Sequence, residues 1–158
     1  MVLAMCDMCE KNYALDWYRY GLEKGDDFFI KFIMHWIAFN WLYSGYCGSN
    51  ESQKIEIFCE DNCYKLSRYN PFDTEAFQIF LEKPIHDIVR GREYTKIYNS
   101  LKKDNDIERV KSLFCTMYHI RCNLFHGSKS FLLERDRRLV SASAEILEGY
   151  LKALLAEG

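Results

Sequence analysis

The stretch that says most about the architecture runs from Ile107 to Lys129 and reads IERVKSLFCTMYHIRCNLFHGSK. Its apolar side chains recur at spacings of three and four residues, the pattern of one buried stripe on an α-helix. The stripe consists of Ile107, Val110, Leu113, Phe114, Met117, Ile120 and Leu124. Gly127 is a typical helix stop, so the sequence predicts a long helix that ends beside His126.

Arg121 lies inside this apolar stripe. At about 100° per residue, its side chain points between those of Met117 and Phe114. A guanidinium keeps its charge, so its burial without a partner is unfavourable. One interpretation is that Arg121 pairs with a buried carboxylate while His126 merely caps the helix, whose C-terminus favours an imidazolium. The other is that Arg121, Asn123 and His126 form a site for a phosphate or a carboxylate.

These residues also resemble a known family. The spacing Arg121-x4-His126, read with the Asn-Leu-Phe-His-Gly that ends at Gly127, resembles the R-x4–6-H signature of the HEPN superfamily. Residues 36–43, Trp-Ile-Ala-Phe-Asn-Trp-Leu-Tyr, are similar to the W-I-A-F-N-x-L-Y helix of that family. Arg135-Asp136 opens a long amphipathic segment, as in the Apea-like branch. The resemblance covers roughly residues 26–155.

Catalytic members of this family are metal-independent endoribonucleases in which two protomers bring their motifs together. The resemblance therefore implies a homodimer without cofactor or metal, with Arg121, His126 and Asn123 as catalytic residues. Histidine suits proton transfer near neutral pH, and the planar fork of arginine suits a phosphate. Asn123 would act as the polar auxiliary, because Cys122 occupies the position after the arginine that is often polar.

A role in defence or as a toxin, with an antitoxin-like protein partner, accompanies this ribonuclease hypothesis. Two alternatives stay open from the sequence. One is a non-catalytic HEPN module that binds a nucleotide, RNA or a partner protein. The other is a purely structural helical interaction domain.

The charge of the chain bears on RNA binding. A net charge of −2 and a pI near 6.1 are not typical of a dedicated nucleic-acid binder, so RNA contacts would depend on local patches. The basic residues beside the motif are Lys129, Arg135, Arg137 and Arg138. Glu134 and Asp136 interrupt this run, which also fits a solvated surface. Asn40, an isolated polar residue in an apolar helix, is either a hydrogen-bonded core amide or a further RNA-binding residue.

Composition indicates one helical domain that spans residues 1–158. The chain is 49% hydrophobic and 28% charged, with only two prolines. Seven cysteines, an odd number, and the lack of a signal-peptide pattern favour a reducing cytoplasm. Cys6-x2-Cys9 and Cys59-x3-Cys63 would supply four zinc thiolates, although buried or incidental thiols are the favoured interpretation.

The periodicity predicts an all-α up-down bundle with four long helices and short additional ones. The predicted helices span residues 11–22, 28–46, 51–68, 74–81, 106–126 and 136–155, with a mixed segment at 85–104. Asp26 or Asp27 is the expected cap of the 28–46 helix, Thr74 that of the 74–81 helix and Asp106 that of the 106–126 helix. The 28–46 helix is apolar almost all round but carries interrupting polar residues, which favours the most buried helix of a bundle over a membrane span. His119 is expected on the polar surface of its helix.

Overall fold

Helices make up nearly all regular structure in the residues that the computed structural model describes, which are 13–87, 90–127 and 132–156. Residues 13–22 are helical. The elements that follow are α2 (Phe28–Tyr43), α3 (Glu51–Asp61), α4 (Cys63–Leu66), α5 (Glu75–Leu81), β1 (His86–Asp87), β2 (Arg92–Glu93), α6 (Thr95–Ser100), α7 (Asp106–Phe125) and α8 (Glu134–Leu155). The predicted all-α helical bundle is confirmed.

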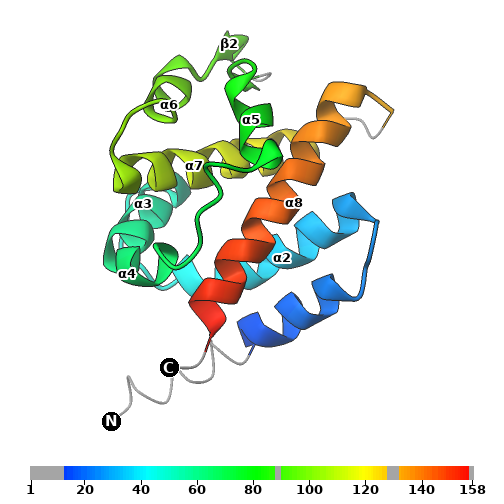
Figure 1. Ribbon diagram of the computed structural model, residues 1–158, viewed down its shortest axis with the longest axis vertical. Helices are drawn as coiled ribbons and strands as arrows, with labels where there is room; N and C mark the ends of the chain where they lie inside the picture. The colour runs from blue at the N-terminus through cyan, green and yellow to red at the C-terminus, as the bar shows by residue number, and fades with distance from the viewer. Residues whose placement is uncertain (1–12, 88–89, 128–131, 157–158) are drawn as a thin grey trace.

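Three helices meet at an aromatic centre. Helix α8 packs along α2 and against α5, whereas α3 and α6 pack on α7. Figure 1 shows α8 running diagonally across α2 and α7. At the centre, the ring of Phe114 stacks on Phe39 at 4.7 Å and lies 4.9 Å from Tyr150. These rings join α7 to α2 and α8.

Helix α2 is capped as predicted but is not the most buried element. The side chain of Asp27 accepts a hydrogen bond from the backbone N–H of Ile30 at 3.2 Å. Trp36 and Phe39 are buried, yet only six of the 16 residues of α2 are, against 13 of 22 in α8. The prediction was wrong because one face of α2 stays open, with Ile30 and Asn40 exposed, whereas α8 packs against both α2 and α5.

Asparagine side chains set two boundaries that the sequence pattern missed. The predicted 51–68 helix breaks at Asn62, whose amide donates to the carbonyl of Phe58 at 3.0 Å and to the Tyr46 hydroxyl at 3.1 Å. Such bonds compete with helical ones. The cap of α7 is Asn105 rather than Asp106, since its side chain accepts from the N–H of Glu108 at 3.2 Å. Thr74 caps α5 as predicted.

The segment predicted as mixed contains an antiparallel hairpin followed by α6. His86 pairs with Glu93 and Asp87 with Arg92. In the part of the chain that the structure describes, no helix is both long and apolar enough to cross a membrane.

The cysteine pairs can be assessed only in part. Cys59 is buried and Cys63 is exposed, while Cys6 and Cys9 lie outside the described residues. Burial raises the pKa of the Cys59 thiol well above its usual value. Within residues 13–87, 90–127 and 132–156, no group of three or more His, Cys, Asp or Glu side chains is arranged to hold a metal ion.

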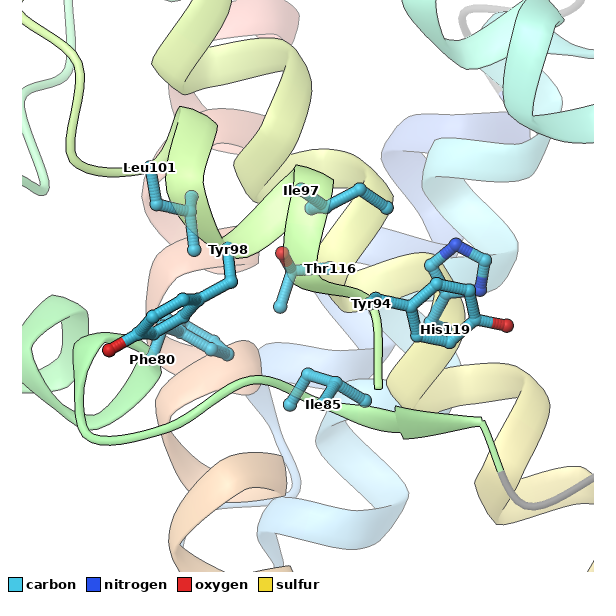
Figure 2. A pocket seen from close by; sticks show the side chains of 8 residues that line it. All are labelled: Phe80, Ile85, Tyr94, Ile97, Tyr98, Leu101, Thr116 and His119. Carbon is cyan, nitrogen blue, oxygen red and sulfur yellow. The ribbon is translucent and has the colours of Figure 1, made fainter. Parts of the chain in front are cut away.

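His119 is not the surface histidine that the sequence suggested. Its ring stacks on that of Tyr94, with centroids 3.7 Å apart and planes inclined by 18°. Figure 2 shows the pair at the edge of a small cavity between α6 and α7. The cavity holds about 10 Å³, roughly the space of one water molecule. Burial lowers the pKa of His119 to about 4, Asp87 opposes this shift, and Arg90 adds to it.

The depressed pKa of His119 predicts a loss of stability in acid. As the pH falls below the ordinary histidine value of 6.5, the unfolded chain takes up a proton that the folded chain resists until about pH 4. We expect this one ring to reduce the free energy of unfolding by about 1–3 kcal/mol between pH 7 and pH 4, since part of the ring still meets solvent.

Urea unfolding of the wild type, His119→Gln and His86→Gln at several pH values measures this effect. His119→Gln should have a shallower decline with acid than the wild type. The exposed His86 is the matched control, so His86→Gln should follow the wild type. An unchanged slope in His119→Gln would rule out this assignment.

Candidate functional site

Arg121 forms an ion pair that joins two helices distant in sequence. Its Nη2 donates to Oε1 of Glu51 at 2.7 Å, which links α7 to the first turn of α3. The Arg121 side chain is 16% exposed and that of Glu51 is 33% exposed. Arg121 therefore has a carboxylate partner, as one interpretation required, although Glu51 is half-buried rather than buried.

A tyrosine completes the cluster from a third helix. The hydroxyl of Tyr43, near the end of α2, donates to the same oxygen of Glu51 that accepts from Arg121. Burial raises the pKa of Tyr43, and the neighbouring Glu51 raises it further, so the phenol stays protonated. We call Arg121, Glu51 and Tyr43 the Arg121 cluster.

Aromatic rings surround the guanidinium of Arg121. Its central carbon lies 5.5 Å from the ring centre of Trp36, 5.2 Å from Tyr118 and 5.4 Å from Phe125. Burial is the largest single influence and lowers the pKa of Arg121, but the charge and hydrogen bond of Glu51, together with Cys122 and Tyr43, outweigh it and the net shift is upward. The Nε atom is buried and has no hydrogen-bond partner among the described residues. The rings and Glu51 together keep a charged, oriented guanidinium near the C-terminal end of α7.

His126 stands at the end of the same helix and faces solvent. It caps α7 and is exposed, and Gly127 after it has a φ of +72°, which ends the helix as predicted. His126 follows Arg121 by five positions, which is about 7–8 Å along the helix axis and 140° around it. The two side chains therefore lie at the same end of α7 without touching each other.

Asn123 points to another part of the molecule. It is 5% exposed, and its Nδ2 donates to the backbone carbonyl of His86 in β1 at 2.9 Å. It lies about 200° around α7 from Arg121. The structure thus brings Asn123 to the hairpin and Arg121 to α3.

Asn40 is exposed, so its interpretation as a buried core amide is wrong. Asn40 lines a surface hollow of about 350 Å³ between the end of α2 and the start of α3. Tyr43 and Glu51 line the same hollow, together with Lys54. Asn40 therefore borders the Arg121 cluster from its outer side.

Two of the predicted basic residues are engaged in the fold. Arg135 donates to Glu82 at 3.0 Å and to the carbonyl of Ile79 at 3.0 Å, and Arg138 donates to Glu82 at 2.9 Å. Hydrogen bonds and charge from these arginines lower the pKa of Glu82, with Arg138 as the main cause. They tie the start of α8 to the end of α5.

Of the other two predicted basic residues, Arg137 is exposed, and Lys129 lies outside the described residues. The run of basic residues beside the motif is therefore partly neutralised by Glu82 rather than wholly available to a ligand.

The sequence pattern gives no indication that Glu51 or Tyr43 belongs to the site. Seventy positions separate Glu51 from Arg121, and no motif links them. The one available signal was the position of Arg121 within the apolar stripe. It indicated that a carboxylate partner was needed, but not which carboxylate.

No protein-family model, curated protein or solved structure matches this chain.

Proposed function

We propose that the chain is a metal-independent endoribonuclease of the HEPN type whose active site forms between two copies. One observation supports the proposal most strongly. The oriented guanidinium of Arg121 and the solvent-exposed ring of His126 lie at the same end of α7. Proton transfer and charge stabilisation are the two tasks that RNA cleavage without a metal requires.

In the proposed reaction, His126 of one copy takes the proton of the ribose 2′-hydroxyl. The 2′-oxygen attacks the phosphorus, and the bond from phosphorus to the 5′-oxygen breaks. His126 of the second copy gives a proton to the leaving 5′-oxygen. The products are a 2′,3′-cyclic phosphate and a 5′-hydroxyl. Because the two copies of His126 take opposite roles, one such histidine per chain is enough.

Arg121 would stabilise the charge of the phosphorane. Glu51 holds one terminal nitrogen of its guanidinium, and the other terminal nitrogen would donate to a phosphate oxygen. Tyr43 and Glu51 then act as positioning residues. Asn123 would contribute by fixing α7 against the hairpin through the carbonyl of His86.

Exposed apolar side chains beside the motif support the pairing of two copies. Phe125 is 57% exposed directly before His126, and Leu132 and Leu133 are exposed where α8 begins. Figure 1 shows that the end of α7 and the start of α8 lie on the same side of the molecule. Large apolar groups that cluster on a surface mark interaction sites.

The variant Phe125→Glu tests this pairing. A charge in the centre of an apolar interface is unfavourable, so we expect the wild type to be a dimer at micromolar concentration and Phe125→Glu to be a monomer. Multi-angle light scattering measures the mass. Leu22→Glu is the matched control, because Leu22 is an exposed leucine away from the motif and should leave the dimer intact.

RNA cleavage by the same two variants completes the test. Phe125→Glu should lose cleavage together with dimerisation, since each active site needs two copies of His126. A monomeric wild type would contradict the proposal. So would a Phe125→Glu monomer that cuts RNA at the wild-type rate.

A non-catalytic module that binds a nucleotide, RNA or a partner protein is the second candidate. The ion pair between Arg121 and Glu51 favours it, because a neutralised guanidinium has less charge to offer a phosphorane. The two candidates differ in one measurable property, which is cleavage of bound RNA.

A further inference from the structure

A second hollow lies at the opposite end of α7 from the motif. It has a volume of about 660 Å³ and is formed by α4, the turn that follows it and the first residues of α7. The 20 residues of α7, from Asp106 to Phe125, span about 30 Å of helix, so this hollow is distinct from the Arg121 cluster. Pockets of 300–1,000 Å³ are the usual size for small ligands.

The walls of this hollow are largely aromatic. Tyr64, Tyr69 and Phe72 line it. Tyr64 is 75% exposed, which is unusually high for a large aromatic side chain. Tyr69 stands edge-on against Tyr150, and so anchors its wall to the core.

Two arginine side chains of the chain already lie over these rings. The guanidinium carbon of Arg109 lies 3.9 Å from the ring centre of Phe72, and that of Arg68 lies 5.2 Å from that of Tyr64. Arg68 covers at most one face of Tyr64, since the residue stays largely exposed. These contacts show that the geometry of the walls accepts positive groups over aromatic faces.

Of the two carboxylates that line the hollow, one has no ion-pair partner in the described part of the chain. Arg109 is paired with Asp106 at 2.8 Å. Asp73 is exposed and makes no ion pair or hydrogen bond with any residue in the described part of the chain. With Arg68 beside Tyr64, the charges around the hollow balance, and Asp73 is the carboxylate whose charge is left to attract a cation.

We infer that this hollow binds a small organic cation of the alkylammonium class, with its charge near Asp73 and its chain against Tyr64 and Phe72. Aromatic faces together with a carboxylate are the general recognition device for such ligands, because both are attractive to positive charge and the rings also cover apolar methylenes. A free polyamine and the side chain of a lysine share this chemistry. The inference does not depend on the proposed ribonuclease activity.

Isothermal titration calorimetry with spermidine tests the inference, and an acetylated, amidated lysine peptide distinguishes the two sources. We expect saturable binding of spermidine with one site per chain. Asp73→Asn and Tyr64→Ala should each weaken it by about fivefold, from loss of an exposed charge contact or of a cation–π contact. Binding of the lysine peptide with the same dependence on Asp73 would extend the ligand to protein side chains.

The controls separate the hollow from the general acidity of the chain. Asp104→Asn removes an exposed carboxylate that does not line the hollow and should leave the affinity unchanged. A diol of similar length to spermidine should not bind. Equal weakening by Asp73→Asn and Asp104→Asn would overturn the inference, as would no measurable spermidine binding at millimolar concentration. All three substitutions are at exposed positions, so the variants should fold.

Discussion

The variant His126→Ala is expected to cleave RNA about 10²–10⁴-fold more slowly than the wild type, which is the range for losing a group that transfers protons in the rate-limiting step. Both the acid and the base of the proposed reaction come from this residue, one from each copy, so a single substitution removes both. The expected loss therefore lies toward the upper end of the range. Initial rates on a labelled single-stranded RNA measure it.

His86→Ala is the matched control for His126→Ala. His86 is also exposed, and Asn123 bonds to its backbone carbonyl, which the substitution leaves in place. Both variants should keep the helical circular dichroism of the wild type, because neither side chain is buried. A folded His126→Ala protein that cuts RNA at the wild-type rate would exclude His126 from the chemistry. Equal losses in both variants would point to a nonspecific effect.

The second large effect concerns stability. Phe114→Ala is expected to lower the free energy of unfolding by about 3–5 kcal/mol, the usual loss for a buried phenylalanine that leaves a cavity. Phe114 is fully buried, and its ring contacts Phe39 of α2 and Tyr150 of α8. The cavity would therefore open where three helices meet and where neighbours have little freedom to close it.

Chemical unfolding at a fixed protein concentration measures this loss. Leu22→Ala is the control, because Leu22 is an exposed apolar residue whose truncation should change the free energy of unfolding by less than about 1 kcal/mol. A Phe114→Ala variant as stable as Leu22→Ala would show that the aromatic centre does not hold the bundle together.

The helical architecture was predictable because it depends on local signals. The stripe along α7, the stop at Gly127 and the caps at Asp27 and Thr74 all appear in the structure where the sequence predicted them. Periodicity reports which face of a helix is apolar. It does not report how many neighbours cover that face, which is why α2 was wrongly predicted to be more buried than α8.

Only the part of the candidate site that lies within one helix could be predicted from the sequence. Arg121 and His126 belong to one helix, so their spacing gave their relative positions. The partner of Arg121 depends on how α3 packs against α7, and this contact between Glu51 and Arg121 leaves no trace in either segment alone. The same holds for Asn123, Arg135 and Arg138, whose hydrogen bonds with His86 and Glu82 follow from tertiary packing.

The most direct test of the proposed function is the chemical analysis of RNA incubated with the wild-type protein in excess EDTA. We expect cleavage to continue and every new end to be a 2′,3′-cyclic phosphate or a 5′-hydroxyl, because two histidines carry out the proton transfers. Cleavage that stops in EDTA would contradict it. So would RNAs of varied sequence that bind the protein and remain intact, a result that would favour the non-catalytic binding module.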